Sequence, residues 1–234
     1  LIKFIDANTD LSVQLHPNDQ LARQRHNSFG KTEMWYIMQS EEASRLILGF
    51  KNGINASDYQ KHLENKTLTS ILNEVPFKKG DTFFIPTGTV HAIGAGIVIA
   101  EIQQTSDITY RVYDWDRVDS NGNSRELHIE EALDAINFAY KGEKKSYSTV
   151  TNESNTMVKC DYFTTNYLQI NGDKAINHVG KDSFVVYMCT EGSAVFTGDH
   201  FREELKFGET ILIPAALKVF NISAENVKLL EIFI

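Results

Sequence analysis

The chain consists mostly of short segments in which hydrophobic and polar residues alternate. A period of two is typical of β-strands, because successive side chains point to opposite faces. Polar turn residues separate the segments, and many short strands at regular spacing predict an antiparallel barrel or sandwich. The fold class is therefore predicted to be mainly β. The clearest strand segments are MWYIM, SRLILGF, DTFFIP, GIVIAEIQQ, ITYRVYD, FVVYMC, SAVFTG and ETILIP.

Two stretches have the period of a helix instead and predict a small helical insertion. The first covers residues 57–75, where Ser57 can cap the helix and Pro76 stops it. The second covers residues 128–139 and places three apolar side chains on one face, those of Ile129, Leu133 and Ile136.

One segment of the chain occurs twice. Residues 78–94, KKGDTFFIPTGTVHAIG, align with residues 206–222, KFGETILIPAALKVFNI. The copies share Lys, Gly, Thr and Pro positions, but His91 of the first copy falls on Val219 of the second. The segment SFVVYMCTEGSAVF also lacks any His-x-His or Gln-x-His pattern. We therefore expect the second copy to bind no metal.

A polar and charged stretch over residues 140–155 separates the two copies and is interpreted as a linker. The expected domains are thus a metal-binding catalytic unit over residues 1–145 and a degenerate supporting unit over residues 146–234. The chain opens with LIKFID, which already has strand character. We therefore expect that an N-terminal portion of the complete protein precedes it.

Composition excludes several classes of protein. With 42% hydrophobic residues among 234, the chain can build a packed core, so disorder is not expected. A net charge of −8 argues against nucleic-acid binding and requires a local Lys or Arg cluster for any anionic substrate. No apolar run is long enough to span a membrane. The only cysteines, Cys160 and Cys189, have no metal or disulfide spacing and favour the cytoplasm; the oligomeric state is not indicated.

A short strand near the start carries polar side chains on one face. In DLSVQLHPND, residues 10–19, the apolar positions alternate with Ser12, Gln14 and His16, and Pro17 ends the strand. Residues two apart in a strand point to the same side. These three side chains therefore face either bulk water or a pocket.

Two further polar residues complete a possible metal site. Glu33 and His91 belong to other strand segments, which a barrel would bring together with Gln14 and His16 in its interior. Two imidazoles, a carboxylate and an amide oxygen can hold Zn²⁺ with room for a water or substrate. Two histidines and a carboxylate also describe non-haem iron sites. Taken singly, each residue has an ordinary explanation as a surface or turn side chain.

The region around His91 resembles a known motif. Gly80, five residues, Pro86, one residue, Gly88, two residues and His91 resemble the second conserved motif of the cupin superfamily. Ala95 stands where that motif usually ends in Asn. The resemblance implies two cupin units, each a jelly-roll or β-barrel.

A more specific resemblance involves the other candidate ligands. Gln14-x-His16, then GKTE-x-WY with Glu33, then P-x-G-x-x-HA, resemble the type I mannose-6-phosphate isomerases. QQTSDITYRVYDWDR, residues 103–117, is similar to the active-site strand of the same family. The resemblance is distinctive over residues 1–139 and weaker through the second unit. The family's usual N-terminal segment is missing here.

The resemblance implies a zinc-dependent isomerase that interconverts mannose 6-phosphate and fructose 6-phosphate through a cis-enediol. It implies one zinc ion per chain, held by Gln14, His16, Glu33 and His91. It implies catalytic roles for Arg111, Lys31 and Asp107. It implies substrate contacts, including contacts to the phosphate, for Ser12, Lys31 and Arg111.

Several of these assignments have open alternatives. Arg111 can instead be a strand arginine that is paired with Asp107 or Asp114. Lys31 can be a solvated lysine, a proton shuttle or a point charge for the sugar phosphate. Two other functions also remain open. A metal-dependent cupin oxygenase shares the ligand types but normally has His-x-His and a nearby Glu. A non-catalytic sensor of sugar phosphates would retain binding without turnover.

Overall fold

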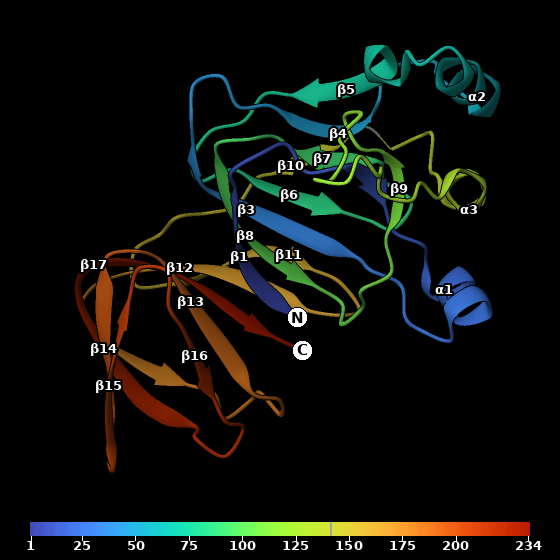
Figure 1. The fold of residues 1–234 in the computed structure, drawn as a ribbon. Helices are drawn as coiled ribbons and strands as arrows, with labels where there is room; N and C mark the ends of the chain where they lie inside the picture. The colour runs from blue at the N-terminus through green and yellow to red at the C-terminus, as the bar shows by residue number, and fades with distance from the viewer. Residues whose placement is uncertain (141) are drawn as a thin grey trace. The chain divides into compact units, whose positions relative to one another are not determined.

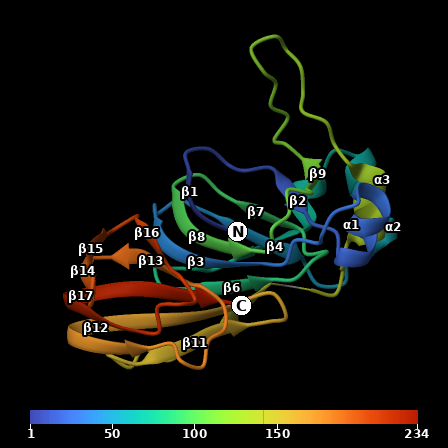
Figure 2. The ribbon, with the colours of Figure 1, turned by 90° about the horizontal axis from the view of Figure 1, so that it is seen from below.

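The structure is a computed structural model that describes residues 1–140 and 142–234 (Figures 1 and 2). It divides into two compact units, Leu1–Lys144 and Lys145–Ile234. The division falls within the stretch interpreted as a linker, residues 140–155, of which Lys141 lies outside the described residues. No helix of the described part is long and apolar enough to cross a membrane.

The first unit contains two antiparallel sheets of five strands each. The first sheet has the order β1 (Ile2–Ala7), β8 (Ile97–Gln103), β3 (Glu33–Ser40), β6 (Thr82–Ile85) and β10 (Glu143–Lys145). The second has the order β5 (Leu72–Val75), β4 (Leu46–Phe50), β7 (His91–Ile93), β2 (Val13–Leu15) and β9 (Tyr110–Tyr113). Figure 1 shows the two sheets as successive layers. Buried apolar residues such as Trp35 and Leu48 form a core to which both sheets contribute.

Three α-helices lie together at one end of the first unit, α1 (Asp19–His26), α2 (Ala56–Glu64) and α3 (Ile129–Ala135) (Figure 1). A short 3₁₀-helix, η1 (Leu68–Ile71), follows α2. Tyr59 of α2 and Ala132 of α3 are fully buried and pack into a core with Val13 and Leu15 of β2. The helices therefore support the strand that carries the candidate ligands Gln14 and His16.

The helix expected over residues 57–75 is wrong in its extent. Its N-cap is Asn55, whose side chain accepts the backbone N–H groups of Ser57 and Asp58 in a capping box. Helix α2 ends at Glu64, and the following residues form η1 and then β5, which pairs with β4. Pairing with a neighbouring strand outweighs the local helical pattern there. Helix α1, which has only one buried residue, was not expected from the sequence.

The second unit is built around one seven-stranded sheet. Its main order is β11 (Ser154–Lys159), β12 (Thr164–Asn177), β17 (Val219–Phe233), β13 (Val185–Glu191) and β16 (Thr210–Ile213). Strand β14 (Ser193–Gly198) pairs with β17 and with β15 (Phe201–Lys206). Buried Tyr187, Phe196 and Phe220 lie in its core. All strand segments named from the sequence contain a strand, and the prediction of a mainly β fold is confirmed.

Candidate active site

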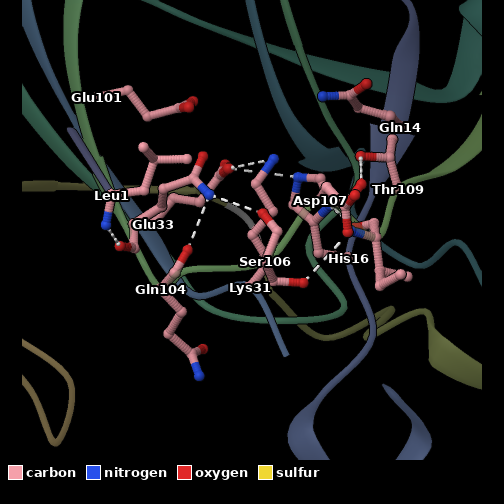
Figure 3. A network of polar contacts seen from close by, with 12 residues as sticks. Leu1, Gln14, His16, Lys31, Glu33, Glu101, Gln104, Ser106, Asp107 and Thr109 are labelled. Carbon is pink, nitrogen blue, oxygen red and sulfur yellow. Dashed lines mark hydrogen bonds and ion pairs between the residues drawn. The ribbon is translucent and has the colours of Figure 1, made fainter. Parts of the chain in front are cut away.

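Three of the expected ligands meet in the interior of the first unit. His16 follows β2, Glu33 begins β3 and His91 begins β7. His16 Nε2 lies 3.4 Å from Glu33 Oε1, and His91 Nε2 lies 3.8 Å from Glu33 Oε2. Their ligand atoms all lie within 4.8 Å of one another, and the three residues are at most 2% exposed. The face of β2 that carries Gln14 and His16 thus points toward Glu33 of β3, and Figure 3 draws these residues in one network.

Backbone carbonyls orient both imidazole rings. His16 Nδ1 lies 2.8 Å from the carbonyl oxygen of Ile108, and His91 Nδ1 lies 2.9 Å from that of Thr89. A carbonyl only accepts hydrogen bonds, so each Nδ1 carries the hydrogen and each Nε2 keeps its lone pair. Burial lowers the pKa of both histidines, and the Lys31 charge lowers that of His16 further. Both rings are therefore neutral, as metal ligands must be.

Three of the facing atoms make no hydrogen bond. His16 Nε2 and both carboxylate oxygens of Glu33 are buried and make no hydrogen bond. Lys31 Nζ lies 3.0 Å from Glu33 Oε1 as an ion pair, but without the geometry of a hydrogen bond. Buried polar atoms without hydrogen bonds are costly, and a cation among these atoms would remove that cost. Two imidazole nitrogens and a carboxylate suit zinc, and equally non-haem iron.

Gln14 lies beside this cluster. Gln14 and His91 are direct partners in the sheet, and Gln14 Nε2 lies 3.4 Å from His91 Nε2. Gln14 Oε1 accepts a hydrogen bond from Ser12 Oγ at 3.2 Å. The amide nitrogen rather than the oxygen therefore lies closest to His91. A half-turn about the last side-chain bond would exchange the two atoms and offer the oxygen to an ion.

A cleft of about 730 Å³ opens next to Gln14. Four of the expected site residues line it, namely Ser12, Gln14, Asp107 and Arg111. Lys31 instead lines a smaller cavity of about 90 Å³ together with His91 and Gln14. Gln14 borders both spaces, so the cluster of ligand atoms is adjacent to the cleft and to the cavity.

Arg111 projects from β9 into the cleft without an ion-pair partner among the described residues. Its Nη1 donates to the carbonyl oxygen of Glu126 at 2.9 Å, and its Nε is buried without a hydrogen bond. Burial and the nearby Arg125 lower the pKa of Arg111. The pairing with Asp107 or Asp114 left open by the sequence is therefore absent, and Asp114 binds other arginines instead.

Two charged residues of the small cavity were missed at the sequence level. Lys3 of β1 forms an ion pair with Glu101 of β8 at 2.8 Å, and Trp35 Nε1 donates to the same carboxylate at 3.1 Å. Burial and the charge of Glu33 raise the pKa of Glu101. The detectable signal was a carboxylate within the otherwise apolar alternation of GIVIAEIQQ.

The pairing registers show which residues of the second unit are equivalent to the ligands. In the repeat, Ile85 is equivalent to Ile213 and His91 to Val219. Glu33 pairs with Ile85 in the first unit, and Val185 pairs with Ile213 in the second, so Val185 is the equivalent of Glu33. Gln14 pairs with His91, and Asn177 pairs with Val219, so Asn177 is the equivalent of Gln14. The equivalents of the four ligands, in chain order, are Asn177, Val179, Val185 and Val219. Valine offers no ligand atom, so the second unit lacks this metal site.

The buried carboxylate, by contrast, occurs in both units. Glu101 pairs with Trp35 across β8 and β3, and Glu231 pairs with Tyr187 across β17 and β13. Tyr187 donates to Glu231 at 3.0 Å, as Trp35 donates to Glu101. This carboxylate therefore does not depend on the ligands.

Known proteins are similar to this chain over most of its length. The family described as "Mannose-6-phosphate isomerase, cupin domain" matches residues 153–233. Mannose-6-phosphate isomerase ManA of Bacillus subtilis is 34% identical over 226 residues, which are 95% of this chain and 71% of that protein. The chain belongs to the mannose-6-phosphate isomerase family. The prediction of this family, and with it of an isomerase, is confirmed.

Further similarities extend along the whole chain. The mannose-6-phosphate isomerase of Streptococcus mutans is 32% identical over 96% of this chain and 71% of its own length. The crystal structure of the mannose 6-phosphate isomerase from Bacillus subtilis superimposes with a TM-score of 0.90 at 31% identity. That match covers 100% of this chain and 74% of the other. The family thus applies to both units, including the one without ligands.

Proposed function

We propose that the chain is a zinc-dependent aldose–ketose isomerase that interconverts mannose 6-phosphate and fructose 6-phosphate through a cis-enediol. The family supports the reaction class. The observation that carries the proposal is the buried cluster of His16, Glu33 and His91 next to a cleft, in which His16 Nε2 and both Glu33 oxygens make no hydrogen bond. Both cysteines are free, which agrees with the proposed cytoplasmic location.

One divalent ion per chain would be held by His16, Glu33 and His91, with Gln14 as a fourth ligand after rotation of its amide. A bound zinc ion supplies Lewis acidity toward a carbonyl or hydroxyl oxygen. The donor set alone also suits iron, but an oxygenase is not the reaction of this family. Zinc is therefore the proposed ion.

The protein's own residues would manage the charge and the proton. Isomerisation moves a proton between C2 and C1 and leaves negative charge on an enediolate oxygen. Arg111 faces the cleft with an unpaired Nε, so its guanidinium can stabilise that charge without first breaking an ion pair. Lys31 is held against Glu33, and Asp107 lines the cleft without a cationic partner among the described residues. These two are the proposed acid–base residues.

An isomerase assay with chelation and metal restoration tests the proposal. The purified chain is expected to convert mannose 6-phosphate, to lose activity on removal of metal and to regain it with one zinc ion per chain. Oxygen uptake with bound iron would establish the oxygenase instead. Tight binding of sugar phosphate without turnover by the metal-loaded protein would establish the sensor.

A further inference from the structure

The segment between β9 and α3 forms a long excursion that borders the cleft. Figure 2 shows it as the yellow-green loop that projects from β9 and returns to α3. Its outer part turns at Gly122, and a bridge joins Val118 to Ser124. Asp114, Arg117 and Arg125 of this excursion line the cleft together with Arg111. At the sequence level, residues 103–117 resembled an active-site strand, but neither Arg117 nor Arg125 was assigned a role.

A single buried carboxylate holds two of these arginines. Asp114 is 6% exposed and forms ion pairs with both Arg117 and Arg125. Arg125 binds it with two nitrogens, and its Nε donates to Asp114 Oδ2 at 2.7 Å. Within the described part of the chain, Nη1 of Arg125 makes no hydrogen bond. Asp114 thus fixes one edge of the guanidinium and leaves the other edge available in the cleft.

The arginine cluster, Arg111, Arg117 and Arg125, shares the cleft with the carboxylates of Asp107, Asp114 and Asp119, of which only Asp114 pairs with an arginine among the described residues. Asp114 supplies one negative charge for the two guanidiniums that it binds. The carboxylate of Asp119 also lines the cleft, but it accepts the backbone N–H groups of its own turn. The charges of Arg125 and Arg117 both lower the pKa of Arg111. The guanidiniums thus repel one another although carboxylates line the same cleft, and a dianion bound between them would relieve that repulsion.

Ser12 lies near the metal end of the cleft and has one hydroxyl hydrogen to donate. Ser12 donates its hydroxyl hydrogen to Gln14 Oε1. That hydrogen becomes available to a substrate only after the Gln14 amide rotates. Arg125, in contrast, has free donors in the fork geometry that matches phosphate oxygens.

We propose that Arg125 binds the phosphate group of the substrate and that Asp114 is its positioning residue. This inference rests on the proposed function, because it takes a sugar phosphate as the ligand. The reacting carbons then lie toward Gln14 and the ligand cluster, while the phosphate lies at the excursion. Binding energy from the phosphate would hold the sugar in register with the metal site.

The test compares the kinetics of Arg125→Gln with those of the wild type, both loaded with zinc. We expect the KM for mannose 6-phosphate to rise about 10- to 100-fold, the usual cost of a charge-assisted contact, with little change in kcat. The inhibition constant of inorganic phosphate should rise by a similar factor. Arg125→Lys should recover part of the loss, because it restores the charge without the fork.

Two further variants separate positioning from general effects. Asp114→Asn is expected to raise KM less than Arg125→Gln, because it loosens the guanidinium without removing it. Arg202→Gln removes the same charge from an exposed strand of the second unit and should leave KM unchanged. An unchanged KM in Arg125→Gln, or a loss confined to kcat, would overturn the inference.

Failure of the proposed function can be recognised separately. If the wild type does not isomerise mannose 6-phosphate, calorimetric titration with inorganic phosphate still tests the subsite. Weaker binding to Arg125→Gln than to the wild type would then support the subsite alone. Equal binding to both proteins would overturn it.

Discussion

Substitution of Gly88 by alanine is expected to weaken both the fold and the metal site. Gly88 has a φ of +80°, and its N–H donates to the carbonyl oxygen of His16 at 2.8 Å. A Cβ at this position would lie 2.5 Å from the carbonyl oxygen of Ala135, at the end of α3. Gly88 is also adjacent to Thr89, whose carbonyl orients the His91 ring. The backbone here therefore sets both imidazoles.

The magnitude follows from two separate costs. A non-glycine residue in the left-handed region costs roughly 1–2 kcal/mol. Relief of a contact with backbone adds a cost typical of overpacking, about 1–3 kcal/mol. We expect Gly88→Ala to lose about 3 kcal/mol of unfolding free energy, which lowers the Tm by roughly 6–12 °C for a domain of this size. Gly53 has a φ of +87° with no atom within 4 Å of a Cβ, so Gly53→Ala carries only the first cost.

Thermal unfolding of both variants, with zinc content measured after dialysis, provides the assay. Gly53→Ala should melt only a few degrees below the wild type and keep its metal. Gly88→Ala should melt lower and retain less zinc, because His16 and His91 are displaced. Equal melting temperatures for the two variants would show that the contact with Ala135 is relieved without cost, and the reasoning would be wrong.

Three other outcomes are expected. His16→Ala should contain no bound zinc by elemental analysis, because the second unit supplies no replacement site; one residual ion per chain would contradict this. Arg111→Ala should keep its zinc but lose about 100- to 1,000-fold in kcat, and a near-normal kcat would remove Arg111 from the chemistry. Burial raises the pKa of Glu231, but His178 and Lys181 outweigh it and hold the pKa well below its ordinary value. As the pH falls below about 4.5, the Glu231 carboxylate takes up a proton in the unfolded chain before it does so in the folded one. The free energy of unfolding measured in urea should therefore decline there, and it should decline less steeply in Glu231→Gln.

The alternation of residue types sufficed to predict the strands, because burial of one face imposes a period of two. The ligands were recognisable because Gln14, His16, Glu33 and His91 occur in a distinctive order. Their approach to one another, however, depends on pairings between strands distant in sequence, such as Gln14 with His91. A local pattern does not encode such a register.

Other parts of the site have no local signature. Residues 72–75 continue a helical pattern but form β5, because β4 offers an edge to pair with. Arg117 and Arg125 lie on either side of a turn. The local sequence does not show that both form ion pairs with Asp114. Glu101 is a carboxylate within an otherwise apolar strand, but only the pairing of β1 with β8 reveals that Lys3 meets it.

The two buried carboxylates, Glu101 and Glu231, show that the two units share one feature of the interior but not another. Both units contain the buried carboxylate, whereas only the first contains the ligand set. In the second unit, valines occupy three of the four ligand positions. Glu231 nevertheless lies buried there beside Tyr187. The buried carboxylate is thus compatible with the fold of a unit that has no ligand set. The second copy is consequently a scaffold for engineering, in which ligands grafted at positions 177, 179, 185 and 219 would create a second metal centre.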